Sequence, residues 1–272
     1  MKSDSLKDLT MEISGLAGRL QEVDAATPTS KATKRKFLKD AEQLMAALAT
    51  ARERLSPVKF GTIDITLGNP KSIAKFFTFN LVNSARLPLP EVLDKRFYGA
   101  GVYAIYYEGS DVKAYEKLSG TETPIYVGKA DPAEPYAETT EGQGEALYKR
   151  LKEHAKNIGK TDLEPCDFTC RYAAIQSGMQ SAVEHFMIRF YQPIWNKEIK
   201  VCYGIGKHGD SAKTRANKRS PWDTMHPGRK WAVDTKEDQK SRAEVEEEIR
   251  KHLEKHPPIA DMDALRKNLA LG

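Results

Sequence analysis

The sequence predicts an α+β fold, in which a small mixed β-sheet is flanked by helices. Short runs of aromatic and β-branched residues alternate with helical stretches in the order strand, strand, helix, strand, helix. Apolar residues also recur at helical spacing over residues 1–56, which predicts a helical arm before the sheet. A basic stretch and further helices follow the sheet, so we expect three parts: an arm (1–56), a core (57–200) and a basic extension (201–272).

Composition sets the broad class of the protein. The chain has 272 residues, of which 40% are hydrophobic and 30% are charged, as in a soluble globular protein. It contains no apolar run of about 18 residues and starts with a polar stretch, so we expect no membrane span, no signal peptide and a cytoplasmic location.

The predicted arm consists of two helices separated by Asp24–Ser30 with its Pro28. We expect them to form an antiparallel hairpin. The residues at helical spacing are Leu6, Leu9, Ile13, Leu16 and Leu20 in the first helix, and Phe37, Ala41, Leu44, Ala47 and Leu48 in the second.

The predicted strands of the core are rich in aromatic and β-branched residues. They are Gly101–Tyr107, Ile125–Val127 and Phe168–Ile175, and an earlier segment, Thr62–Leu67, also alternates like a strand. Residues 108–123 separate the first two of the core strands, as a long hairpin loop would.

Two helices are predicted in the core and two after it. The first spans Ala146–Ile158, and the second runs to Tyr191 from a capping box formed by Ser177 and Gln180, with Pro193 preventing its continuation. After the core, Lys236–His256 forms a charged helix with an apolar stripe of Val245, Ile249 and Leu253, and Leu265–Leu271 forms a last one.

The three cysteines, Cys166, Cys170 and Cys202, are too few for a disulfide framework. Cys166 and Cys170 have zinc-like spacing, but no second close Cys/His pair completes a site. We therefore interpret all three as reduced structural thiols.

Glu184 stands out in its helix, because apolar residues surround most of the helix circumference. A carboxylate in such surroundings costs free energy unless a cation or hydrogen-bond donors meet it. Two explanations of Glu184 among these apolar residues stay open: it is a functional carboxylate, or it forms a structural ion pair with an arginine. Arg150 and His154 share one helix face, but such a pair alone is no catalytic signature.

Two tyrosine motifs change this balance. Gly101-Val102-Tyr103 lies on one predicted strand, and Tyr126-Val127-Gly128-Lys129 ends the next. Followed in order by Arg150, His154, Glu184 and Asn196, the set resembles the GIY-YIG nuclease superfamily over residues 99–197. One departure is the spacing of the tyrosines, since the 22 residues between Tyr103 and Tyr126 are about twice the usual number.

The resemblance implies hydrolysis of phosphodiester bonds with one Mg²⁺ per active site, held by Glu184. Arg150 is expected to bind the phosphate with its planar guanidinium. Tyr103 is expected to act as base or to position water, and Tyr126 to hydrogen-bond water or phosphate, although these two roles can be exchanged. Lys129 and His154 supply a positive field, and Asn196 fixes the region of Glu184.

A second stretch, Arg215–Arg229, resembles a segment of the GIY-YIG type II restriction endonucleases that cut the palindrome CCGCGG. The local excess of basic residues from Lys200 to Lys230 fits a surface that binds double-stranded DNA. The candidate DNA-binding residues are Lys207, Arg215, Lys218, Arg219 and Arg229.

Because one set of site residues cuts one strand, a palindromic site implies a homodimer or a higher homo-oligomer. Two other readings stay open at this point. One is a GIY-YIG nuclease of repair or homing type, and the other is a non-catalytic DNA-binding protein on the same scaffold.

Overall fold

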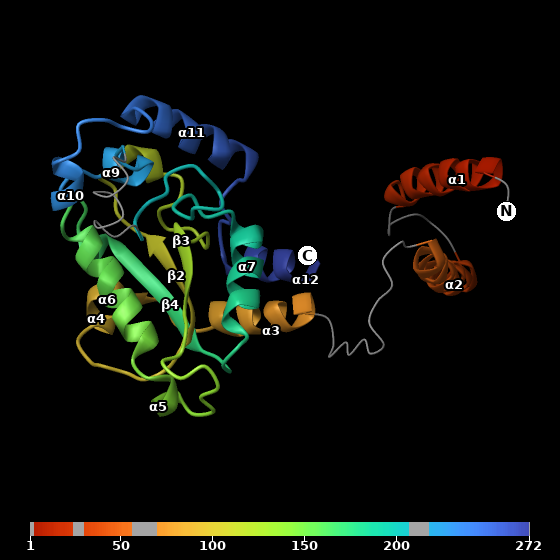
Figure 1. The fold of residues 1–272 in the computed structure, drawn as a ribbon, viewed down its shortest axis with the longest axis horizontal. Helices are drawn as coiled ribbons and strands as arrows, with labels where there is room; N and C mark the ends of the chain where they lie inside the picture. The colour runs from red at the N-terminus through yellow and green to blue at the C-terminus, as the bar shows by residue number, and fades with distance from the viewer. Residues whose placement is uncertain (1–2, 24–29, 56–69, 207–217, 272) are drawn as a thin grey trace. The chain divides into compact units, whose positions relative to one another are not determined.

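A computed structural model describes residues 3–23, 30–55, 70–206 and 218–271 of the chain (Figure 1). The chain divides into two compact units, Met1–Ile65 and Thr66–Gly272. The predicted strand Thr62–Leu67 lies outside the described residues. The division into arm, core and basic extension stays a prediction.

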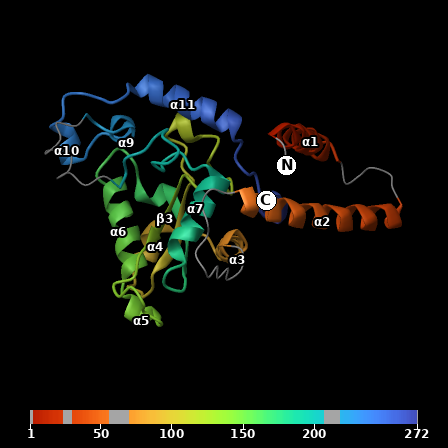
Figure 2. The same ribbon diagram turned by 45° about the vertical axis from the view of Figure 1, so that its right-hand side comes forward.

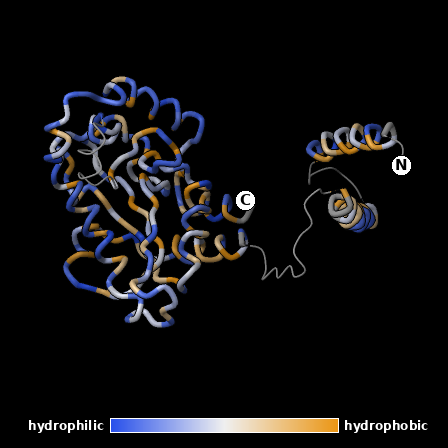
Figure 3. Tube along the Cα trace, in the orientation of Figure 1, coloured by the Kyte–Doolittle hydropathy of each residue, from blue (hydrophilic) through white to orange (hydrophobic). Residues whose placement is uncertain are grey.

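The described residues of the first unit form two helices, α1 (Ser3–Gln21) and α2 (Lys31–Leu55), where the apolar spacing predicts them. In Figure 3 hydrophobic and hydrophilic segments alternate along α1. Large apolar side chains of this unit are exposed, among them Leu9 (44%), Ile13 (39%) and Phe37 (44%). The arrangement of the two helices as a hairpin stays a prediction.

The second unit is built on a four-stranded sheet of order β1-β4-β2-β3. Its strands are β1 (Leu87–Pro88), β2 (Gly101–Tyr107), β3 (Tyr126–Ala130) and β4 (Phe168–Ala174). The α+β class is confirmed. All three strand pairings are antiparallel, however, so the expectation of a mixed sheet is wrong in this detail.

Alternation along β2 divides the core into two layers, because successive side chains of a strand point to opposite faces. Tyr103, Ile105 and Tyr107 pack with α6 (Ala146–Ile158) on one face. Residues of the opposite parity pack on the other face with α3 (Pro70–Val82), α7 (Gln180–Tyr191) and α12 (Met262–Leu271). Figures 1 and 2 show α6 and α7 on either side of the sheet. The active-site candidates on these two helices therefore approach the sheet from opposite faces.

The predicted capping box of α7 is wrong. The residue before the helix is Met179, and it makes no side-chain capping bond. Ser177 instead donates its hydroxyl to the carbonyl of Ala137 (2.8 Å), and Gln180 accepts from the backbone N–H of Gly178 (2.8 Å). The two side chains thus fix the loop before the helix. The helix ends at Tyr191 as predicted, with Gln192 in the left-handed region (φ 52°).

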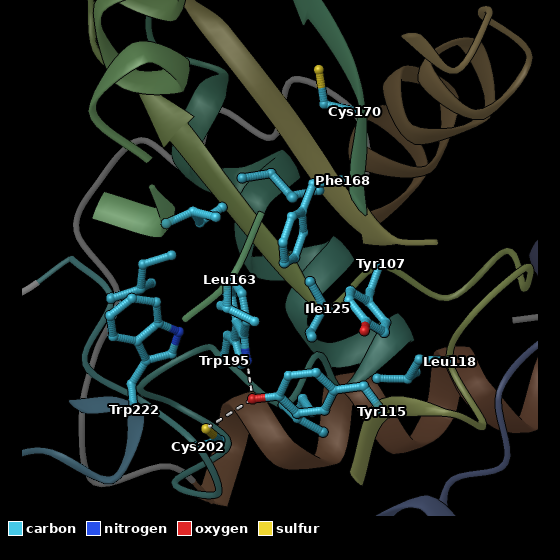
Figure 4. Close-up of a cluster of buried hydrophobic side chains, with 14 of the residues drawn as sticks. Tyr107, Tyr115, Leu118, Ile125, Leu163, Phe168, Cys170, Trp195, Cys202 and Trp222 are labelled. Atoms are coloured by element: carbon cyan, nitrogen blue, oxygen red, sulfur yellow. Dashed lines mark hydrogen bonds between the residues drawn. The ribbon is translucent and has the colours of Figure 1, made fainter. Parts of the chain in front are cut away.

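The connection between β2 and β3 is a packed part of the core. It carries a short 3-10 helix, η1 (Lys113–Tyr115), and Tyr115 is fully buried. Figure 4 shows the Tyr115 hydroxyl meeting Trp195, whose indole N–H donates to it (3.0 Å), and the thiol of Cys202 (3.5 Å). The same hydroxyl is hydrogen-bonded to Nε2 of His226 (2.7 Å). These bonds join the C-terminal part of the chain to the sheet.

The C-terminal part contributes the short helices α9 (Pro221–Met225) and α10 (Lys230–Val233), and then α11 (Arg242–Lys255). The predicted apolar stripe of α11 is buried against the core. This helix begins later than predicted, because the capping box lies at Ser241 and Glu244. The remaining short elements are α4 (Leu89–Val92), α5 (Thr140–Gln143) and η2 (Pro165–Asp167). Cys170 and Cys202 are buried thiols and Cys166 is exposed. No helix among the described residues has the length and apolarity to cross a bilayer.

Two buried histidines should make stability depend on pH. Burial lowers the pKa of His154 to about 3, and it also lowers the pKa of His226 although Asp162 partly offsets it. In the unfolded chain both histidines regain an ordinary pKa, so the unfolded state binds more protons as the pH falls below about 6.5. We expect the free energy of unfolding to fall between about pH 6.5 and pH 5, at a slope approaching about 1.4 kcal/mol per pH unit for each histidine.

Urea unfolding measured across this pH range checks the prediction. Most carboxyl groups stay ionised there, so the histidines dominate the change. A His154→Gln variant should show a shallower pH dependence than the unaltered chain. Equal stability at both ends of the range would contradict the buried, neutral state of the two rings.

Candidate active site

The predicted site residues meet beside β3, which is an edge strand of the sheet. A cavity of about 340 Å³ opens there between α6, α7 and the end of β3. Its lining residues are Tyr126, Lys129, Ala130, Asp131, Ala146, Arg150 and Glu184. Four of the seven predicted catalytic residues therefore line one cavity, and Tyr103, His154 and Asn196 lie behind this lining.

Tyr103 and His154 form a buried pair. Tyr103 is fully buried, and its hydroxyl is hydrogen-bonded to Nε2 of His154 at 2.7 Å. Tyr126 is only partly buried, and its ring lies 4.8 Å from the ring of His154, centroid to centroid. Thus Tyr126 faces the cavity, whereas Tyr103 contacts the imidazole behind it. Two other tyrosines of β2 belong to the core: Tyr107 packs on the same face of the sheet as Tyr103, and Tyr106 lies on the opposite face.

Both site tyrosines are poor bases in this environment. Burial raises the pKa of Tyr126 to about 12 and raises the pKa of Tyr103 well above 10.0. The charge of Arg150 opposes this rise in both cases. Both hydroxyls are consequently protonated at neutral pH. The expected positive field of His154 is absent, because burial lowers the pKa of that ring to about 3 and leaves it neutral, so deprotonating either tyrosine needs positive charge beyond that of Arg150.

Gly128 explains the glycine of the second tyrosine motif. It pairs with Tyr103 across the two strands, and a Cβ at this position would collide with the tyrosine ring and hydroxyl. A glycine therefore leaves the space in which the Tyr103 ring reaches His154. The two motifs depend on each other through this contact.

Glu184 is half-buried in the cavity wall. Burial is the largest cause that raises its pKa, and the charge of Lys129 partly offsets the rise. Within the described part of the chain, no arginine or lysine lies within ion-pair distance of its carboxylate. The structural ion pair considered from the sequence is therefore not formed there. A carboxylate of this kind is ready to receive a cation.

Lys129 pairs with Asp131, a residue outside the tyrosine motifs. Its ammonium group donates to both carboxylate oxygens of Asp131, at 2.6 and 2.5 Å. Residues two apart on a strand share a face, so the period of β3 was the signal that places Asp131 beside Lys129. Lys129 thus lowers the pKa of Glu184 through its charge and donates hydrogen bonds to Asp131. Its ammonium group does not bond to the tyrosine hydroxyls.

Arg150 reaches the cavity from α6 with its side chain 36% exposed. Its guanidinium donates to Glu153, one turn further along the helix, at 2.6 Å. The remaining donors of the fork can bind an anion in the cavity.

Asn196 is placed differently from the expectation that it fixes the region of Glu184. Its amide group accepts from the N–H of Val127 (2.9 Å) and donates to the carbonyl of the same residue (2.8 Å). These bonds satisfy the backbone of an edge strand. Asn196 therefore positions β3, and with it Tyr126 and Lys129.

The predicted DNA-binding residues separate into three groups. Lys207 and Arg215 lie outside the described residues. Lys218 is exposed and pairs with Glu237 (3.1 Å), and Arg219 is half-buried and pairs with Asp238 (2.7 Å).

Arg229 forms the third group, and the expectation that it binds DNA is wrong. It is 3% exposed, and it donates to Asp223 (2.7 Å) and to the carbonyls of Gly204 and Ile205. Because these acceptors surround its guanidinium inside the protein, Arg229 holds the segment together and is not presented to DNA.

Comparison with known families agrees with this geometry. A family model described as the Eco29kI GIY-YIG domain matches residues 95–253, which is more than half of the chain. The match contains every one of the predicted catalytic residues. A comparison with curated proteins found no match. On the family match and the site it contains, the chain belongs to the Eco29kI family of GIY-YIG restriction endonucleases.

Proposed function

We propose that this restriction endonuclease is a Mg²⁺-dependent type II enzyme that hydrolyses both strands of double-stranded DNA at a short palindrome. The observation that carries the proposal is the arrangement across one cavity. The half-buried carboxylate of Glu184 faces the guanidinium-bearing Arg150 and the hydroxyl-bearing Tyr126. Phosphodiester hydrolysis needs a carboxylate that binds a metal, a guanidinium that binds the phosphate and a hydroxyl that contacts water, and this cavity contains all three groups.

The residues of the cavity fit one Mg²⁺ ion. Mg²⁺ keeps several waters and needs only one or two carboxylates from the protein. Glu184 supplies one carboxylate, and it has no competing ion pair in the described part of the chain. When bound, the metal neutralises negative charge on the phosphate and the leaving oxygen.

Arg150 binds the non-bridging phosphate oxygens. Its guanidinium keeps its charge at every relevant pH and presents its donors in a fixed plane. The bond to Glu153 holds this plane at the cavity. Negative charge that develops in the transition state then meets a pre-oriented donor.

The two tyrosines take different parts. Tyr126 lines the cavity, so its hydroxyl is the one that contacts water or phosphate directly. Tyr103 acts through His154 and holds the ring beside Tyr126. This assignment keeps the role first expected for Tyr126, whereas Tyr103 contacts the His154 ring instead of water. The charge of Lys129 favours the ionised form of Glu184. Asn196 holds β3 in place through Val127, and with it Tyr126 and Lys129.

We further propose that the working unit is a homodimer or a higher homo-oligomer. In the described part of the chain, the site residues form one set that lines a single cavity, and one such set cuts one strand. The exposed apolar side chains of α1 and α2 offer a surface for a second copy. The basic stretch then contacts the duplex through Lys207, Arg215, Lys218 and Arg219, and CCGCGG is the palindrome we propose.

Sequencing the ends of plasmid fragments tests the specificity. The proposal expects discrete fragments whose ends share one short palindrome. Sedimentation of the protein on DNA should show at least two chains per site. Random ends, or a monomer that nicks one strand, would contradict the type II proposal.

A further inference from the structure

The solvent-facing side of α6 carries a row of basic side chains that the proposed site does not use. They are Lys149, Lys152, Lys156 and, just after the helix, Lys160, called here the lysine row. All four are exposed. Their spacing of three or four residues places them along one side of the helix.

The charge of the lysine row is not balanced. Among the described residues, none of its members forms an ion pair, and the single acid within α6, Glu153, is bound to Arg150. Helix α11 shows the usual alternative, because Arg250 pairs there with Glu247 and Glu254. The row is therefore a strip of positive charge, whereas α11 neutralises its own.

The position of the lysine row links two parts of the proposed DNA surface. Arg150 reaches the cavity from the same helix. The other end of α6 meets the segment around α9 and α10, since the Cβ of any side chain at position 228 would collide with the carbonyl of Lys160. Figures 1 and 2 both show α6 running from α5 to α10. The row thus extends from the cavity toward the start of α10 at Lys230.

We propose that the lysine row binds the phosphate backbone of duplex DNA that flanks the cleavage site. A helix rises about 1.5 Å per residue, so the row is roughly 16 Å long. One DNA strand carries a phosphate about every 3.4 Å along the duplex axis, and the row therefore spans roughly five phosphates. A lysine that contacts only phosphates contributes point charge without reading bases, so this contact strengthens binding to all sequences alike. The inference rests on the proposed nuclease function.

Salt-dependent DNA binding tests the lysine row. The variant carries Lys149→Gln, Lys152→Gln, Lys156→Gln and Lys160→Gln together, and binding to a non-specific duplex is measured at several salt concentrations without divalent metal. Each phosphate contact contributes about 0.9 to the slope of log K against log salt. We expect the slope to decrease by about 3 to 4 in magnitude. The same four positions changed to Arg should keep the wild-type slope.

A matched control neutralises two exposed lysines of α11, Lys251→Gln and Lys255→Gln, and should leave the slope unchanged. Thermal unfolding shows whether the fourfold Gln variant is folded. If that variant is unfolded, the four single Gln variants are measured instead, and each is expected to lower the magnitude of the slope by about 0.9. If the unaltered protein binds and cleaves DNA but the Gln variant has the same salt slope, the proposed role of the lysine row is wrong and the proposed function stands. If the unaltered protein neither binds nor cleaves DNA, both are wrong.

Discussion

Replacing Glu184 with Ala should abolish DNA cleavage while DNA binding is retained. The carboxylate is the proposed metal ligand, and metal stabilisation of the transition state amounts to several kcal/mol. We therefore expect a loss of roughly 1000-fold or more in the single-turnover rate. Binding should change little, because the basic surfaces stay intact.

Two measurements make this result specific. Glu198→Ala removes a nearby exposed carboxylate whose charge also acts on Glu184, and it should keep most of the activity. Thermal unfolding of Glu184→Ala should show unchanged or higher stability, because a half-buried carboxylate without an ion pair is lost. Near-normal cleavage would place the metal elsewhere. Global unfolding would instead support a structural ion pair for Glu184.

Replacing Arg150 with Lys should reduce the rate of cleavage by about 100- to 1000-fold, the usual effect of losing one oriented transition-state donor. Lysine preserves the charge but loses the planar fork. The single-turnover rate at saturating protein reports the chemical step, and a separate binding titration shows whether affinity is kept.

Arg189→Lys provides the matched control, since Arg189 is exposed on α7 and does not line the cavity. It should cleave at the wild-type rate. A fully active Arg150→Lys variant would show that a point charge at this position is enough, and would contradict the proposed role of the planar guanidinium.

The elements that were predicted well are those whose local pattern and tertiary contacts agree. The apolar residues of α6 have helical spacing and all pack on the sheet, and β2 is aromatic and buried on both faces. The helix α3 was missed because its apolar residues occur on several sides, and Phe76 and Phe79 stay exposed. The cap of α7 was wrong because Ser177 and Gln180 bond to the preceding loop, a choice that depends on the position of Ala137.

Site residues follow the same rule. The motif order identifies Tyr126, Arg150 and Glu184, because topology brings α6, α7 and β3 together. Local charge density failed for Arg229, since its partner Asp223 and the acceptor carbonyls converge only in the folded chain. The pairing of Lys129 with Asp131 was accessible from strand alternation.

Cleavage of a defined duplex decides whether the protein is a Mg²⁺-dependent type II restriction endonuclease. A duplex that contains CCGCGG, labelled on both strands, is incubated with the purified protein in Mg²⁺ and, in parallel, in EDTA. We expect hydrolysis of both strands at fixed positions in Mg²⁺ and intact strands in EDTA. Equal cleavage in Mg²⁺ and in EDTA would contradict the proposed dependence on metal. If the protein binds DNA but cleaves neither CCGCGG nor any other palindrome of a duplex library in Mg²⁺, the proposed type II activity is wrong.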